Sequence, residues 1–126
     1  MKRTLQTLIA LACLLTLAAQ AAERNIDRYP EKPIRFIVPF PPGALNDYLG
    51  RLLATKFTEN WNKQMVVDNR AGGSTIIGTE MAAKAAPDGY TLLLCSVALA
   101  VNQTLFPKLP YNTDKDLAFE IGRAHV

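Results

Sequence analysis

The sequence predicts an α/β fold in which helices flank a parallel sheet, and three observations lead to this class. Strand-like and helix-like segments alternate from Ile34 onward, in the order strand, helix, strand, helix, strand. The first apolar run, "PIRFIVPF", does not alternate strictly, which suits a strand covered on both faces. Right-handed crossovers between consecutive strands then give a parallel sheet with helices on its faces.

The first predicted helix carries a stripe of apolar residues. Their spacings of 3, 1, 3, 1, 4 and 4 match one face of a helix, at Leu45, Tyr48, Leu49, Leu52, Leu53, Phe57 and Trp61. We expect this stripe to face the core, and Asn46 or Asp47 to cap the helix. Gly50 inside the helix costs about 1 kcal/mol relative to alanine, which the stripe should outweigh.

The second half of the chain predicts two further strands and a second helix. The strands are "QMVVDN" and the start of "YTLLLCSVALA", the latter buried. The helix is "IIGTEMAAKAA", with Ser74 or Thr75 as its cap. Its expected core residues are Ile77, Met81, Ala82 and Ala85. "APDGY" predicts a turn, and "AVNQTLFPKLPYN" a short helical turn that prolines stop.

The start of the chain predicts a secretory signal peptide. Lys2 and Arg3 precede an apolar run over residues 4–19, and Ala19-Gln20-Ala21 fits a small-x-small cleavage site. The run is short for a membrane span, so we expect residues 1–22 to be removed and no membrane insertion afterwards. Removal leaves twelve basic against eleven acidic residues, without a basic patch interleaved with aromatics, which argues against nucleic acid as a partner.

The carboxyl ends of the predicted strands are the candidate binding site. Ligands of open α/β sheets bind there, where helices begin, and the segments concerned are Pro39–Asp47, Asn69–Thr75 and Cys95–Ala98. A helix N-terminus offers unpaired N–H groups and a partial positive charge, so it can hold a carboxylate without Arg or Lys. Gly43 lets a ligand approach the backbone closely. A stiff, capped turn without a ligand is the alternative, and the residues alone do not decide between them.

Other chemistries find little support in the residues. Gly73 and Gly78 have P-loop spacing, but Thr79 and Glu80 follow where Lys and Ser or Thr belong. Cys95 is expected to be buried and structural, because a nucleophile needs a base and His125 is the only histidine. Arg70 could pair with a ligand carboxylate or remain a solvated loop charge. We expect no catalytic residue, no metal and no cofactor.

Several ordered blocks resemble one family. "YPEKPIRFIVPFPPGALNDYLGRLLA", "VVDNRAGGSTIIGTEMAAKAAPDGYTLLL" and "NQTLFPKLPYNTDKDLA" resemble the substrate-binding proteins of tripartite tricarboxylate transporters, called Bug or TctC receptors. The resemblance implies a periplasmic receptor with two α/β lobes that close on a small carboxylate and present it to membrane permease subunits. It makes residues 23–119 the N-terminal part of the first lobe of a periplasmic-binding-protein-like, type II-like fold.

The resemblance also implies site residues, some of which depart from the family pattern. Ala44 replaces a usual glycine, Asn46 a usual hydroxyl residue, and Ala71 a usual proline, whereas Asp47 is kept. Cys95-Ser96-Val97-Ala98 stands where glycine with Ser or Thr is common. A less polar pocket or a different acid could follow. The expected ligand-binding residues are Phe40, Pro42, Gly43, Ala44, Asn46, Asp47, Gly73, Ser74, Thr75, Ser96 and Val97.

The last residues, 120–126, do not resemble the family. "EIGRAHV" matches the translation of a common sequencing adapter, so we expect a non-native tail in which His125 has no function. Two other functions stay open at this stage. The first is an exported receptor that senses a carboxylate for a signalling system, and the second is an exported α/β hydrolase that uses Cys95 or Asp47.

Overall fold

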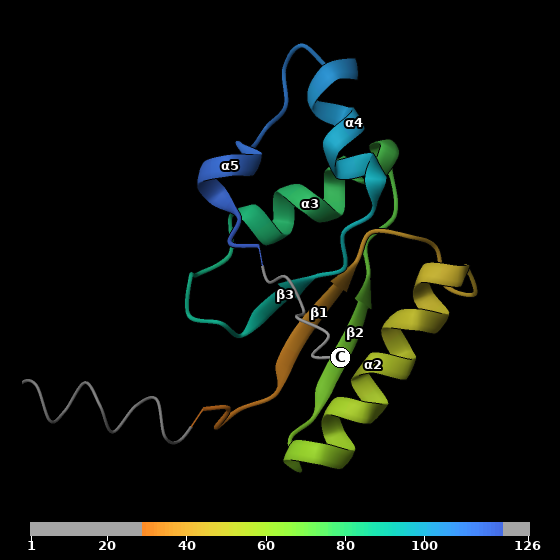
Figure 1. Cartoon of the computed structure of the whole chain (residues 1–126), viewed down its shortest axis with the longest axis vertical. Coiled ribbons are helices and arrows are strands. Elements are labelled where there is room, and N and C mark those ends of the chain that lie inside the picture. The colour runs from red at the N-terminus through yellow and green to blue at the C-terminus, as the bar shows by residue number, and fades with distance from the viewer. Residues whose placement is uncertain (1–28, 120–126) are drawn as a thin grey trace, which may run out of the picture. The chain divides into compact units, whose positions relative to one another are not determined.

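The computed structural model describes residues 29–119 of the chain. The expected signal peptide at residues 1–22 and the expected tail at 120–126 lie outside the described residues, as does His125. Residues 29–31, which form no helix or strand, belong to a separate N-terminal unit. The elements of the second unit follow in order (Figure 1): β1 Ile34–Val38, α2 Leu45–Trp61, β2 Met65–Asn69, the 3₁₀ turn η1 Gly73–Thr75, α3 Ile76–Ala83, β3 Thr91–Leu93, α4 Val97–Leu105 and α5 Thr113–Asp116.

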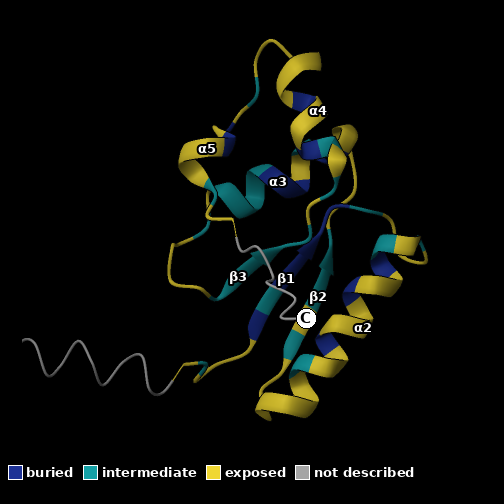
Figure 2. Ribbon diagram, viewed as in Figure 1, coloured by how far each residue is buried: buried dark blue, intermediate teal, exposed yellow. Residues whose placement is uncertain are grey.

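The three strands form one parallel sheet in the order β2-β1-β3, which confirms the predicted α/β class. Ile34 lies opposite Met65 and Val38 opposite Asn69, while Phe36 lies opposite Leu92. The central strand β1 forms the core, because Ile34, Phe36, Ile37 and Val38 are all buried (Figure 2). β3 is only half-buried and three residues long, so the prediction of a buried third strand was wrong.

Helices cover both faces of β1. Gly50 of α2 approaches the side chains of Val38 and Phe36, whereas Arg35 contacts Met81 of α3. Successive side chains of a strand point to opposite faces, so α2 and α3 lie on opposite faces of the sheet. This arrangement explains why the apolar run of β1 does not alternate.

The predicted core face of α2 was wrong. Leu45, Tyr48 and Trp61 are 73%, 65% and 57% exposed, and Leu49, Leu52 and Leu53 are exposed as well. Phe57 is half-buried and packs edge-on against the Trp61 ring. The buried residues of α2 are Asp47, Gly50 and Ala54. Small residues face the sheet because the helix lies close to β1: a Cβ on Gly50 would sit 2.9 Å from Val38 Cγ2.

The predicted helix caps were also wrong in part. Ala44, not Asn46 or Asp47, is the N-cap residue of α2, and it makes no side-chain capping bond. Thr75 is the N-cap residue of α3, as predicted, but its side chain makes no capping bond. Ile77 is exposed, whereas Gly78 and Thr79 are buried. The other expected core residues of this helix, Met81, Ala82 and Ala85, are half-buried.

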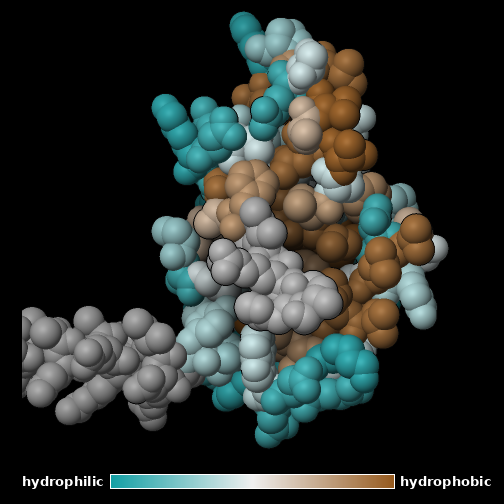
Figure 3. Space-filling model, viewed as in Figure 1, coloured by the Kyte–Doolittle hydropathy of each residue, from teal (hydrophilic) through white to brown (hydrophobic). Residues whose placement is uncertain are grey.

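Helix α4 begins earlier than the sequence predicted. It starts at Val97, separated from the end of β3 by three residues, because the Ser96 hydroxyl accepts a hydrogen bond from the Ala98 N–H over 3.2 Å and caps the helix. The expected buried cysteine was wrong, since Cys95 is exposed. Apolar side chains gather on the surface over α4 and along α2 (Figure 3), with Val97 and Leu105 among the most exposed. No helix within residues 29–119 is long and apolar enough to cross a bilayer.

Candidate functional site

Three segments meet at the carboxyl edge of the sheet, as the sequence predicted. Beyond β1 the ladder continues on both sides: the Arg70 N–H donates to the Val38 carbonyl over 2.8 Å, and the Leu94 N–H donates to the Ile37 carbonyl over 2.9 Å. Because all three strands are parallel, Pro39–Asp47, Asn69–Thr75 and Cys95–Ala98 leave the sheet at one edge.

The first segment closes on the Asp47 carboxylate. Asp47 Oδ2 accepts a hydrogen bond from the Gly43 N–H over 2.8 Å and from Arg51 Nε over 3.1 Å. Gly43 has φ +84°, a left-handed conformation in which a residue with a Cβ is strained. Asp47 is only 4% exposed, so the carboxylate lies under the segment and fixes its path into α2.

Asn69 joins the end of β2 to this segment. Its Nδ2 donates to Asp47 Oδ1 over 2.9 Å and to the Phe40 carbonyl over 3.1 Å. Its Oδ1 accepts from Arg51 Nη2 over 3.1 Å. Every polar atom of the Asn69 side chain is therefore engaged, and the first two segments are held together by one amide.

These contacts set the charge of Asp47. The hydrogen bond from Arg51, then those from the Gly43 N–H and Asn69, lower the pKa of Asp47 from 3.8 to about 2, against the opposing effect of burial. Asp47 is thus ionised at neutral pH and balanced by Arg51. A buried carboxylate with both oxygens occupied favours a role in positioning the loop over direct contact with an anionic ligand.

The second segment has an unusual backbone. Gly72 and Gly73 have φ values of +132° and +53°, and Ser74 and Thr75 follow with +54° and +74°. Two residues with a Cβ are thus held in the left-handed region at the start of α3. Thr79 Oγ1 donates to the Thr75 carbonyl over 2.9 Å, and Asn102 Nδ2 of α4 donates to the Ser74 carbonyl over 2.7 Å.

The predicted ligand-binding residues all lie in the segments at one edge of the sheet, but they differ in how far they are exposed to solvent. Pro42, Gly43, Gly73, Ser74 and Val97 are exposed; Phe40, Ala44, Asn46 and Ser96 are half-buried; Asp47 and Thr75 are buried. The exposed and half-buried members of this set are accessible at the edge, whereas the side chains of Asp47 and Thr75 are covered.

Sequence reasoning did not single out three residues that organise the edge: Arg51, Asn69 and Asn102. One of them carried a signal. Arg51 stands four residues after Asp47, which is the spacing of a helical ion pair. Asn69 and Asn102 gave no such signal, because Asn69 is an ordinary asparagine at the end of a strand and Asn102 is followed by the polar residues Gln103 and Thr104.

The contacts of Arg70 favour a structural role over ligand binding. Its Nε donates to Asp68 Oδ1 over 2.8 Å, and Arg35 Nε donates to the other oxygen of the same carboxylate over 2.8 Å. Burial raises the pKa of Asp68, but the two arginines outweigh it and lower the pKa below its ordinary value. Arg70 therefore belongs to an ion-pair cluster on β1 and β2.

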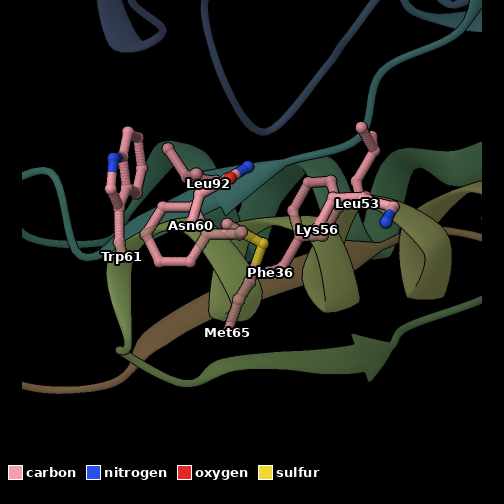
Figure 4. Close-up of a pocket in the computed structure, with 8 residues that line it drawn as sticks. Phe36, Leu53, Lys56, Asn60, Trp61, Met65 and Leu92 are labelled. Carbon is pink, nitrogen blue, oxygen red and sulfur yellow. The ribbon is translucent and has the colours of Figure 1, made fainter.

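A separate hollow of about 460 Å³ lies between α2 and the sheet (Figure 4). Its walls are five α2 residues and one residue from each strand: Leu53, Lys56, Phe57, Asn60, Trp61, Phe36, Met65 and Leu92. Met65 opens β2 and Trp61 ends α2, so the hollow lies towards the other end of the strands. It contains none of the predicted site residues. Among the described residues, no cluster of His, Cys, Asp or Glu could hold a metal ion.

Comparison with known proteins supports the resemblance described above. Residues 49–123 match the model of the "Tripartite tricarboxylate transporter family receptor". The chain is 44% identical over 112 residues to Protein BugT of Bordetella pertussis, covering 87% of this chain and 34% of that protein. It spans about a third of the length of the curated relatives that it matches.

Solved structures give the same result. Periplasmic binding protein BugD is 34% identical with a TM-score of 0.64, covering 67% of this chain and 28% of that one. MatC from Rhodopseudomonas palustris with bound malate and Rpa4515 of R. palustris with adipate are each 30% identical with TM-scores of 0.65. The match to MatC covers 70% of this chain and 30% of the MatC chain, and the match to Rpa4515 covers 68% of this chain and 29% of the Rpa4515 chain. These likenesses identify the fold as part of a periplasmic-binding-protein fold.

Proposed function

Because the chain belongs to the tripartite tricarboxylate transporter receptor family, we propose that it captures a small carboxylate in the periplasm and delivers it to membrane permease subunits. Residues 23–119 then form the N-terminal part of the first lobe of a two-lobed receptor, after removal of the signal peptide at residues 1–22. The family is one of receptors, and catalysis has no role in this proposal.

The convergence of three helix-starting segments at one sheet edge carries the proposal. α2, α3 and α4 all begin at this edge, each directly after a segment that leaves the carboxyl end of a strand. The unpaired N–H groups and partial positive charges of helix N-termini favour an anion. A carboxylate there would be held by backbone N–H groups of the Pro39–Asp47 segment and by the hydroxyls of Ser74 and Ser96.

The nearby arginines support recognition by the backbone. Arg51 is paired with Asp47 and Asn69, and Arg70 with Asp68, so the positive charge of each arginine is already balanced by a carboxylate of the protein. Because these arginines are already paired with carboxylates, we assign the positive potential of the site to the N-termini of helices α2, α3 and α4. Such a site suits a small, fully enclosed acid.

Dicarboxylates are the first ligands to test. Two related receptors hold malate and adipate, which are both dicarboxylates of different length. We propose that one carboxylate binds the edge described here and that the remainder of the ligand is enclosed by the second lobe. The apolar surfaces of α2 and α4 would then be covered by the remainder of the receptor.

A thermal-shift screen of the complete gene product against carboxylic acids tests this proposal. A ligand that binds only the folded state raises stability by about 2.7 kcal/mol at a hundred times its Kd. We expect at least one acid to raise the melting temperature and its uncharged amide analogue to have no effect. If no acid does so, or if acid and amide act equally, the site does not recognise a carboxylate.

The choice between transport and sensing is tested separately. Permease genes beside this gene support delivery to a transporter, and co-purification of the receptor with those permease subunits in the presence of ligand would establish it. A neighbouring sensor kinase gene, with binding to that kinase instead, would overturn the transport part and leave carboxylate capture intact.

A further inference from the structure

The turn Gly73–Thr75 is held in a conformation that its own residues do not favour. Ser74 and Thr75 have φ values of +54° and +74°, and a left-handed backbone brings the Cβ close to the following carbonyl oxygen. Thr75 is β-branched, which makes the conformation still less favourable. Backbone strain of this kind persists only where the surroundings fix it.

Asn102 supplies the long-range contact that fixes this turn. Its side chain is 2% exposed, and its Nδ2 donates to the Ser74 carbonyl over 2.7 Å and to Thr75 Oγ1 over 3.4 Å. The first of these bonds joins residues 28 positions apart in the sequence. The Thr79 hydroxyl also bonds the Thr75 carbonyl, but from within the same helix, so it cannot place the turn relative to α4.

The position of Asn102 on α4 couples two of the three binding segments. α4 begins at the Ser96 cap, so the helix that carries Asn102 is the one that the third segment starts. A bond from this helix to Ser74 therefore sets the distance between the second and third segments. Asn69 does the same for the first and second segments, through Phe40 and Asp47.

We propose that Asn102 is a positioning residue that keeps the Gly73–Thr75 turn left-handed and in register with Ser96, so that the turn is preorganised for the ligand. This inference rests on the proposed function for its effect on affinity. An ordinary alternative is that Asn102 is a buried hydrogen-bonding residue that only stabilises the fold.

The test compares Asn102→Asp with Gln103→Glu in the complete gene product. Both replace an amide by a carboxyl on α4, but Gln103 is exposed, so its change should be silent. The aspartate side chain in Asn102→Asp has the same shape as asparagine but no NH₂ group. A carboxylate oxygen therefore lies where Nδ2 donated to the Ser74 carbonyl. We expect about a tenfold rise in Kd for the carboxylate found in the screen, the loss expected for one net hydrogen bond. A lower melting temperature with unchanged Kd would overturn the proposal.

A second readout does not need a ligand. Amide hydrogen exchange at residues 73–75 should quicken by about tenfold in Asn102→Asp, while exchange in β1 stays unchanged. Thr75→Gly, which accepts the left-handed conformation without strain, should restore part of the lost affinity. If the wild-type protein binds no acid, the proposed function fails while exchange still decides the role of Asn102. Unchanged exchange at 73–75, or no recovery with Thr75→Gly, contradicts that role.

Discussion

The side-chain amide of Asn69 donates to the Asp47 carboxylate over 2.9 Å, across 22 positions of the sequence. The bond joins the end of β2 to the first turn of α2, and Arg51 closes the group by contacting both side chains. A buried network in which every polar group is paired makes a loop rigid, but the loss of any one member leaves its partners unpaired and lowers the stability.

Replacing Asp47 by asparagine should destabilise the protein more than the equivalent change at Glu59. In Asp47→Asn the new NH₂ group would face the donors of Arg51 and Asn69, and the ion pair would be lost. Glu59 lies on the same helix in an exposed pair with Lys56, so Glu59→Gln should change stability by less than about 1 kcal/mol. Urea unfolding measures both. Equal midpoints for the two variants would show that the network does not stabilise the fold.

The stability of the protein should fall in acid because of Asp47. Its pKa in the folded state is about 2, below the ordinary value of 3.8. A lowered pKa means that the stabilisation is present above the ordinary value and is lost as the pH falls towards 2. The unfolding free energy of the wild type should therefore decrease between pH 4 and pH 2 more steeply than that of Asp47→Asn. Parallel curves for the two proteins would contradict the assignment.

Alanine at Gly78 should be more harmful than alanine at Gly50. A Cβ on Gly78 would lie 2.8 Å from the Arg70 carbonyl oxygen and from Pro39 Cβ, groups that cannot move aside. A Cβ on Gly50 would meet Val38 Cγ2 at 2.9 Å, and that methyl group can shift. Overpacking costs about 1–3 kcal/mol, offset by about 1 kcal/mol of helix propensity. Urea unfolding of Gly78→Ala and Gly50→Ala should show a net loss for the former and a smaller effect for the latter. The reverse order would contradict the packing.

Cys95 should react with a thiol reagent in the folded protein. The residue is exposed directly before Ser96, at the edge proposed to bind the ligand. We expect rapid reaction without denaturant, slowed when a binding carboxylate is present. Ala100 is exposed on α4 outside the binding segment and offers a control: in Cys95→Ala with Ala100→Cys, the new thiol should react at a rate that the carboxylate does not change. Reaction only after unfolding would show that Cys95 is covered in the complete receptor.

The sequence predicted the class of the fold and the edge where the site lies, because both depend on patterns within single segments. Three apolar runs separated by helices give a parallel sheet, and parallel strands bring their following loops together. The helix faces could not be predicted in this way. The apolar stripe of α2 satisfied the periodicity rule, yet α2 presents Asp47, Gly50 and Ala54 to the sheet, since close approach to Val38 requires small residues.

The residues that organise the site escaped sequence reasoning for a related reason. Asn69 and Asn102 act on Asp47 and Ser74, which are 22 and 28 positions away. Such pairings depend on the three-dimensional arrangement of the strands and helices and leave no local pattern. The early start of α4 was missed because the Ser96 cap begins the helix only a few residues after β3 ends at Leu93, inside one largely apolar run.

Mapping of the ligand by NMR tests the central claim most directly. Amide resonances of the isotope-labelled complete gene product would be compared with and without the carboxylate that gives the largest thermal shift. If the strand-end segments bind the acid, the largest changes will be at the amides of Gly43, Ala44, Ser74, Thr75 and Ser96. The hollow beside α2 is the competing site. Largest changes at Phe36, Leu53, Trp61 and Leu92, with the strand-end amides unmoved, would contradict the account.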